Sequence, residues 1–400
     1  MFSCSVNRYF PFQRVKIVRQ SVTPDALVAW IRIEADNRFR PICHVCGNKV
    51  GRVHATDRRR VRDLNLATAQ VWLYVTYRKV KCDSCDGIHI ENLGFVEPYA
   101  HVTKRLAHYI HDLCKVMTIK EVARHVNLDW KTVKNIDKMF LEEEFGETDY
   151  QDLRILAVDE ISRGRHHDYL TVVLDYLTGR IVWIGEGRKQ STLDAFFEGM
   201  PEKDRNRIEA VAMDMWDPFI AAVKRWCPNA KIVFDFFHVV QAFNRVIDKV
   251  RNQEYRKATE EEKEVIKGSK FLLLKNKVNL QKKEKPHLKE LLRLNQNLST
   301  VYILKDALKG IWNYKYPKCA QKALENWCEL ARESGIQCVV KFAGKLGRYR
   351  EGILNHCCYP IHTSKLEGVN DKLKVIKRDA YGFLDTRYFI LKAKQAFPGI

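Results

Sequence analysis

The chain has 400 residues, 46% of them hydrophobic and 30% charged, so it is long enough for two or three domains around a large core. Its 69 lysines and arginines exceed its 49 acidic residues, and the resulting formal net charge of +20 favours a polyanionic partner, nucleic acid above all. No apolar run approaches the roughly 18 residues of a membrane-spanning helix, and the first residues lack a signal-peptide pattern. We therefore expect a cytoplasmic, nucleoid-associated protein with no membrane partner.

Two C-x-x-C pairs stand in the first quarter of the chain, in CHVCG and KCDSCDG. Cys43, Cys46, Cys82 and Cys85 can supply four thiolates to one tetrahedral Zn²⁺. The alternative is two unrelated pairs, although a redox C-x-x-C normally occurs once, beside a thioredoxin-like pattern that is missing here. Apolar residues alternate over 71–82, which predicts a strand that runs into the second pair. Four cysteines close the site, so we expect a structural zinc rather than a catalytic one.

A basic run lies between the two cysteine pairs. It contains Arg58, Arg59, Arg60 and Arg62, and arginine at this density suits contacts with phosphates. A solvated loop is the alternative interpretation.

Residues 103–140 have the features of a helix-turn-helix. Apolar residues recur with a helical period over 103–117, Thr118 and Glu121 form a capping box, and Asp129 suits the N-cap of a helix over 130–140. Three side chains of that last helix are of types that reach phosphates or base edges: Lys131, Lys134 and Asn135. The alternative is a plain helical hairpin that joins two domains. The acidic residues 141–152 predict a linker.

The second half of the chain alternates strands and helices. We expect a strand over 153–160 that ends at Asp159, a hairpin over 168–187, a strand over 208–215 that ends at Asp214, and a strand over 231–235. Helices are expected from Ser191, from Pro218 and from His238. Three antiparallel strands followed by two parallel strands is the order of the ribonuclease H fold.

In that order the ends of the first and fourth strands lie side by side, so Asp159 and Asp214 would come within reach of common ions. Glu367, on a late helix, can complete a set of three carboxylates that holds two Mg²⁺ or Mn²⁺ ions for phosphoryl transfer. Basic residues around it suit a DNA backbone: Lys372, Lys374, Lys377 and Arg378.

Other acidic residues compete for the same role. Glu160 should point to the opposite face of its strand, and Asp175 lies at a hairpin end, where it suits a turn. Asp235 and His238 lie beside the expected site and could orient a ligand. The alternative for Asp235 is the N-cap of the helix that follows.

The chain resembles the DDE transposases of bacterial insertion sequences, in the group called ISL-three, along almost its whole length. CHVCG and VKCDSCDG are similar to that family's zinc finger, and residues 103–140 to its helix-turn-helix. AVDE, MDMWDPFIAAVKRWCPNAKIVFDFFHVV and KLEGVNDKLKVIKRDAYGF are similar to its catalytic core. The resemblance implies that Asp159, Asp214 and Glu367 are the metal-binding triad.

The fold class implied is multidomain α+β/α/β. We expect a zinc-finger domain over 1–97, a helix-turn-helix domain over 98–150, and a ribonuclease H-like mixed-sheet domain over 151–400. An all-helical, lysine-rich insertion occupies about 248–350, where Trp312 and Trp327 are expected in the core.

The function implied is that of a bacterial transposase acting on double-stranded DNA. It would bind terminal inverted repeats, cleave a phosphodiester at each end of the element, and join the freed 3′-hydroxyls to target DNA. Because two ends must be processed together, a homodimer or a larger synaptic assembly is expected. A DNA-binding regulator without activity and a structure-selective nuclease are the alternatives on the same fold.

Overall fold

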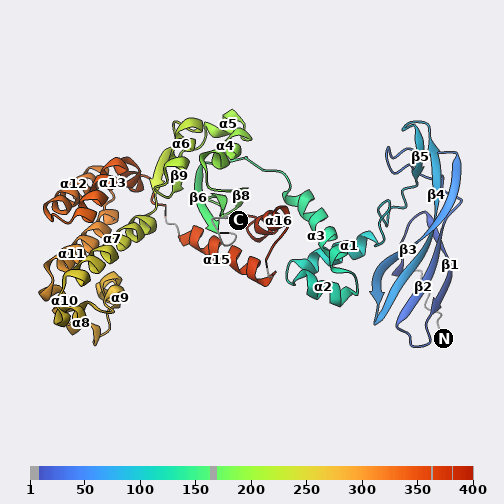
Figure 1. The fold of residues 1–400 in the computed structure, drawn as a ribbon. Helices are drawn as coiled ribbons and strands as arrows, with labels where there is room; N and C mark the ends of the chain where they lie inside the picture. Colours follow the sequence, from blue (N-terminus) through green and yellow to red (C-terminus); the bar gives the residue numbers. More distant parts are fainter. Residues whose placement is uncertain (1–8, 163–168, 362–363, 381, 400) are drawn as a thin grey trace. The chain divides into compact units, whose positions relative to one another are not determined.

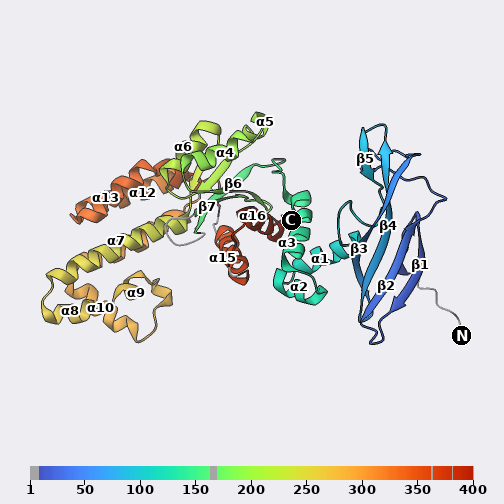
Figure 2. The same ribbon diagram turned by 45° about the vertical axis from the view of Figure 1, so that its right-hand side comes forward.

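The computed structural model describes residues 9–162, 169–361, 364–380 and 382–399 (Figures 1 and 2). The chain divides into two compact units, residues 1–144 and residues 145–400. No helix in the described part of the chain is long and apolar enough to cross a membrane.

The first unit is built on a five-stranded sheet. Its strands are β1 (Val15–Val22), β2 (Val28–Ala35), β3 (Val53–Leu66), β4 (Ala69–Cys82) and β5 (Gly87–Ile90). The order is β1-β2-β4-β3, with β5 also paired to β4, and all pairs are antiparallel except β2 with β4. The strand predicted over 71–82 is confirmed as β4.

The two faces of this sheet have different surroundings. Ile31, Ile33, Leu73 and Val75 point to one face, where they form a core with residues of the segments before β1 and after β5. The intervening residues of β2 and β4 point to the other face and are half-buried or exposed, as in an antiparallel sheet that is solvated on one side. We call this second face the outer face.

Three helices follow: α1 (Lys104–Cys114), α2 (Ile119–Val126) and α3 (Trp130–Phe145). The predicted caps are confirmed, because Thr118 and Glu121 form both hydrogen bonds of a capping box and Asp129 accepts a hydrogen bond from the backbone N–H of Lys131 at 2.9 Å. α3 is longer than expected, since Leu141 is fully buried and keeps the chain helical to Phe145. The linker predicted over 141–152 is therefore wrong for its first residues.

A buried carboxylate fastens the start of α1 to the sheet. Asp63, in β3, is 0% exposed and accepts hydrogen bonds from Thr103 Oγ1 and from Arg105 Nε, each at 2.7 Å. Thr103 is also the N-cap of α1. A buried charge that is fully hydrogen-bonded in this way holds its partners firmly, because losing either partner leaves an uncompensated polar group.

The second unit contains a five-stranded mixed sheet in the order β10-β9-β6-β7-β8. Its strands are β6 (Ile155–Ser162), β7 (Tyr169–Asp175), β8 (Ile181–Glu186), β9 (Ala210–Met213) and β10 (Lys231–Phe234). β6, β7 and β8 are antiparallel, whereas β9 and β10 run parallel to β6. The predicted strand order is confirmed, including the pairing of the first and fourth strands.

Strand β6 is longer than predicted, whereas the turn after β7 is as predicted. β6 continues to Ser162, which pairs with Tyr169, so Asp159 lies inside the strand rather than at its end. Asp175 is a turn residue, as predicted, because it accepts hydrogen bonds from Leu177 N at 3.1 Å and Thr178 Oγ1 at 2.6 Å. Gly179 completes that turn with a φ of +76°, a conformation that glycine adopts without strain.

Helices cover both faces of the second sheet (Figures 1 and 2). On one face, Leu156 and Val158 pack with residues of α4 (Gln190–Glu198) and α6 (Asp217–Trp226), and α5 (Glu202–Arg205) joins this side. On the other face, Ala157 and Ala212 pack with residues of α15 (Ser364–Asp379) and α16 (Thr386–Ala396). Because successive side chains of β6 point to opposite faces of the sheet, they pack into two different cores.

The segment between β10 and α15 is helical, as expected. After α7 (Phe236–Lys257) come α8 (Glu260–Ile266), α9 (Lys270–Leu274), η2 (Lys277–Asn279), α10 (Glu284–Leu294), α11 (Gln296–Gly310), η3 (Ile311–Asn313), α12 (Pro317–Glu333), α13 (Gln337–Arg348), α14 (Arg350–Leu354) and η4 (Asn355–Cys357). Trp327 is 2% exposed and donates to Leu304 O at 2.8 Å, which confirms it as a core residue. Trp312 is half-buried against the same core.

Candidate metal centre and active site

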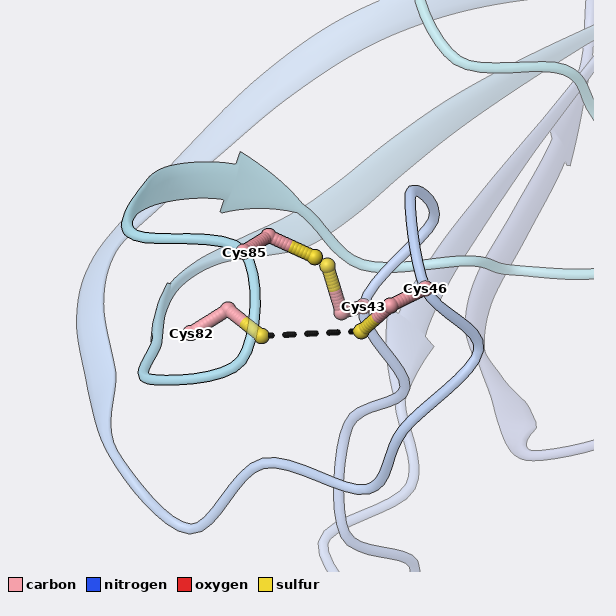
Figure 3. Close-up of side chains that lie close together, drawn as sticks. All are labelled: Cys43, Cys46, Cys82 and Cys85. Atoms are coloured by element: carbon pink, nitrogen blue, oxygen red, sulfur yellow. Dashed lines mark hydrogen bonds between the residues drawn. The ribbon is translucent and has the colours of Figure 1, made fainter.

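The four cysteines of the two C-x-x-C pairs converge at one end of the first sheet (Figure 3). Their sulfur atoms all lie within 4.8 Å of one another, and the sulfurs of Cys46 and Cys82 are 3.7 Å apart. Two sulfurs bound to a tetrahedral zinc at ~2.3 Å would be separated by about 3.8 Å. The donor set and its spacing therefore fit a structural Zn²⁺.

Strand β4 and the loop before β3 position these cysteines. β4 ends at Cys82, and a glycine with a φ of +73°, Gly47, follows the first pair. Cys43 and Cys82 are buried against Val50 and Val80. The backbone N–H of Asn48 lowers the pKa of Cys46 to about 7, whereas the neighbouring Cys46 raises the pKa of Cys85 to about 12. Of these two cysteines, Cys46 is thus the one that more readily becomes a thiolate.

The basic run predicted to contact phosphates lies on β3. Arg58 and Arg60 are exposed, whereas Arg59 is half-buried over the ring of Tyr77. Arg62 is 1% exposed and donates to the main-chain oxygen of Val71 at 3.1 Å. The prediction that Arg62 contacts phosphate is wrong, because its guanidinium is buried within the protein.

The helix-turn-helix exposes two of its three predicted contact residues. Lys131 and Asn135 are exposed on α3, and Lys134 is half-buried. An open hollow of about 350 Å³ lies at the turn between α2 and α3. It is lined by Lys120, Ala123, Arg124, Asn127, Leu128 and Trp130.

Asp159 lies on β6, and Asp214 directly follows β9, the neighbouring parallel strand of the second sheet. β6 and β9 are paired as far as Ala157 with Ala212, so continuing this register by two residues sets Asp159 beside Asp214. Parallel strands are about 4.8 Å apart, and residues two apart share a face. Asp159 and Asp214 each come two residues after an alanine that packs with α15, so both acids are expected on the face that α15 covers. Burial raises the pKa of Asp159, and the charge of Asp214 adds to this effect.

Helix α15 reaches this pair of acids through Asn370. Asn370 Nδ2 donates to Asp159 Oδ2 at 2.5 Å. Glu367 lies one helical turn earlier on α15 and is exposed. Among the described residues, the four cysteines are the only group of three or more His, Cys, Asp or Glu side chains gathered closely enough to hold a metal ion, and Glu367 is not grouped with the two aspartates.

The hydrogen bond from Asn370 to Asp159 was not predicted from the sequence. An amide three residues after a candidate glutamate is on the same side of a helix, and that spacing was the signal available.

Asp235 and His238 join the same site from the start of α7. His238 Nδ1 lies 2.9 Å from Asp214 Oδ1, and Nε2 lies 3.5 Å from Asp235 Oδ2. Asp235 also accepts from Phe237 N at 2.9 Å, so it caps α7 as well. Burial lowers the pKa of His238, but the hydrogen bond to Asp214 and the surrounding carboxylates outweigh burial, and the net shift is upward.

Glu160 has different partners from Asp159. It lies 3.7 Å from Arg188 Nη1, and that guanidinium is stacked over the ring of Tyr169 at 4.3 Å. Burial raises the pKa of Glu160, and Arg188 opposes that shift. The side chain of Glu160 therefore pairs with Arg188, whereas that of Asp159 is hydrogen-bonded to Asn370 of α15.

The basic residues predicted around Glu367 all lie on α15. Lys372, Lys374 and Arg378 are exposed, and Lys377 is half-buried. Lys374 pairs with Asp371 at 2.9 Å.

A four-cysteine zinc site, a helix-turn-helix and a mixed α/β core with paired acids together define a multidomain DNA-binding protein. Three family models match the chain in the same order. Residues 40–85 match the zinc-finger of transposase IS204/IS1001/IS1096/IS1165, residues 91–141 match the helix-turn-helix domain of transposase family ISL3, and residues 156–393 match the ISL3 transposase model.

Curated relatives agree with these matches. The chain is 41% identical to the transposase for insertion sequence element IS1001 of Bordetella parapertussis, over 90% of this chain and 89% of that protein. It is 26% identical to the transposase for insertion sequence element IS1557 of Mycobacterium tuberculosis, over 89% of this chain and 86% of that protein. The chain belongs to the ISL3 family of insertion-sequence transposases, as its sequence predicted.

Proposed function

We propose that the second unit is a ribonuclease H-like core that cleaves and joins DNA strands with Asp159, Asp214 and Glu367 as its metal-binding acids. The observation that supports the proposal is the register of β6 and β9, which, continued by two residues, would bring Asp159 beside Asp214 on the face that packs against α15. Glu367 is on that helix, one turn from the residue that hydrogen-bonds Asp159. The proposal requires α15 to turn or slide so that this carboxylate reaches the pair.

The donor chemistry suits Mg²⁺ or Mn²⁺, because carboxylate oxygens are the ligands these ions prefer. Asp159, Asp214 and Glu367 would hold them. The bound ions would activate a water or a 3′-hydroxyl and neutralise the leaving oxygen. Burial raises the pKa of Asp159, and a cation bound beside this carboxylate would favour its ionised form.

The surrounding side chains of this unit would orient the acids and the DNA. His238 lies between Asp214 and Asp235 and would fix the Asp214 carboxylate. Asn370 would hold Asp159 and set the position of α15. The exposed basic residues of α15, Lys372, Lys374 and Arg378, would contact the phosphate backbone on either side of the reacting bond.

The first unit would select the DNA ends. Its zinc site and helix-turn-helix would bind terminal inverted repeats, with Lys131 and Asn135 of α3 facing the DNA. We propose domains at 1–97, 98–150 and 151–400, and a dimer or larger assembly that holds two ends at once.

The test is strand cleavage and joining with labelled element ends in Mg²⁺. Asp159→Asn and Glu367→Gln are each expected to lower the rate by a factor of a thousand or more, because each removes a ligand charge. Asp371→Asn, an exposed acid on the same helix, is the matched control and is expected to keep activity. Wild-type rates in both active-site variants would refute the assignment. End binding that persists without cleavage in the wild-type protein would instead favour a regulator, and cleavage of branched DNA regardless of sequence would favour a nuclease.

A further inference from the structure

The outer face of the first sheet carries aromatic side chains where polar ones would be expected. Trp30 of β2 is stacked with Trp72 of β4 at 6.1 Å between ring centroids and with Tyr74 of β4 at 5.0 Å. The planes of these pairs are inclined by only 28° and 25°. Trp30 is thus in the middle of a stacked row, and Tyr74, which is 42% exposed, is at its open end. Trp30 and Trp72 are half-buried, so the row is a partly exposed aromatic cluster, and contiguous apolar groups at a surface often mark interaction sites.

Arginines lie beside this row on the same face. The strand registers place Arg19, Arg32, Tyr74 and Arg60 in one line across β1, β2, β4 and β3. Like charges directly opposite each other, as Arg19 and Arg32 are, destabilise a sheet. Arg32 is relieved by Glu34 at 3.1 Å, but no ion pair of Arg19 or Arg60 with a carboxylate is found among the residues the structure describes.

The other end of the row is occupied by the protein itself. The buried guanidinium of Arg62 lies over the ring of Trp72, 5.8 Å from its centroid. This contact shows how the face can hold a planar, delocalised group against an aromatic ring. At the opposite end of the row the Tyr74 side chain is exposed to solvent.

We propose that the outer face, defined by Trp30, Trp72, Tyr74, Arg19, Arg32 and Arg60, binds unpaired nucleotides of DNA. An unpaired base offers a ring face that can stack on Tyr74, while its phosphates lie against the arginines. Paired bases in a duplex cover each other's faces, so duplex DNA could use the arginines but not the aromatic row. None of these residues is one of the four cysteines or part of α3. Its biological setting rests on the proposed strand cleavage, which produces free strand ends, but the binding itself does not require catalysis.

The test is fluorescence anisotropy of the full chain with a labelled oligothymidylate of about 12 nucleotides and with a hairpin duplex of unrelated sequence. Tyr74→Ala is expected to weaken single-strand binding about tenfold, because stacking on one base contributes ~1–3 kcal/mol. Tyr74→Phe keeps the ring and should bind like wild type. Arg60→Gln should weaken single-strand binding. It should also reduce the slope of log affinity against log salt concentration by about the amount expected for one phosphate contact.

Matched controls separate this site from the rest of the basic surface. Tyr99→Ala removes another exposed tyrosine of the same unit, outside the sheet, and should leave single-strand binding unchanged. The proposal is overturned if Tyr74→Ala binds the oligothymidylate like wild type. It is also overturned if the substitution weakens duplex binding equally, or if it changes only the oligomeric state in sedimentation, which would assign the face to a second copy. Asp159→Asn should bind the oligothymidylate normally, so a failure of the cleavage proposal leaves this result independent.

Discussion

The hydrogen bond from Asn370 to Asp159 offers a direct test of how α15 is fastened to the active site. Replacing Asn370 by Leu removes the donor 2.5 Å from Asp159 Oδ2 and keeps a side chain of similar size. A hydrogen bond to a charged group contributes about 1.5–3 kcal/mol. If that orientation is needed in the reaction, strand cleavage at limiting Mg²⁺ should slow about tenfold to a hundredfold.

The same substitution should move the pH dependence in a defined direction. Burial raises the pKa of Asp159, and the Asn370 donor is one of the contacts that lower it. Without that donor the pKa rises further, so Asp159 becomes protonated at higher pH. The acid limb of the cleavage rate should therefore shift to higher pH in Asn370→Leu. A purely structural loss would lower the rate without moving this limb.

Asp371→Asn is the control for this experiment, because Asp371 is the next residue on α15 and makes only an exposed ion pair with Lys374. Exposed pairs contribute at most about 1 kcal/mol, so the control should stay within roughly fivefold of wild type. If Asn370→Leu cleaves within twofold of wild type and its acid limb does not move, the contact has no part in catalysis and our account of α15 is wrong.

Three further predictions concern the zinc site and the core. Cys82→Ser should release the zinc and lower the melting temperature of the first unit, as measured by metal analysis and calorimetry, whereas Cys319→Ser, at an exposed cysteine outside the cluster, should retain zinc. Trp327→Ala should destabilise the second unit by about 3–5 kcal/mol, a fall of roughly 6–20 °C in melting temperature, while Trp130→Ala, at 47% exposure, should not affect that unit's melting. Burial lowers the pKa of Lys305 in the folded state from 10.5 to about 8. Between pH 7 and pH 9.5 the folded state therefore loses the Lys305 proton while the unfolded state keeps it. The free energy of unfolding of the wild type, measured by urea melts, should rise over this range relative to that of Lys305→Met. Equal responses of wild type and Lys305→Met across that range would contradict this.

Much of the architecture followed from local patterns. The alternation over 71–82, the Thr118 and Glu121 box, and the turn at Gly179 each depend on neighbouring residues, and each is confirmed. The order of strands in the second sheet also follows, because parallel strands require crossover helices and the helices were visible in the sequence.

Features that depend on distant partners were harder to foresee. Arg62 has the same side chain as Arg60, and only its place against Trp72 and Val71 makes it a buried structural residue. The full length of α3 depends on the burial of Leu141. The contact between Asn370 and Asp159 joins residues far apart in the chain; the spacing of Asn370 from Glu367 places both on one side of α15 but does not identify Asp159 as the partner.

The buried Asp63 has a consequence for how DNA would be read. Because it fastens the start of α1 to β3 through Thr103 and Arg105, the zinc-bearing sheet and the helix-turn-helix, which lie in one compact unit, cannot swivel freely about the segment between β5 and α1. If both parts contact DNA as proposed, their fixed spacing would make them meet the double helix at a fixed rotational phase. Inserting about five base pairs, half a helical turn, between their two contact sites should abolish simultaneous engagement, whereas about ten base pairs would restore the phase but not the distance.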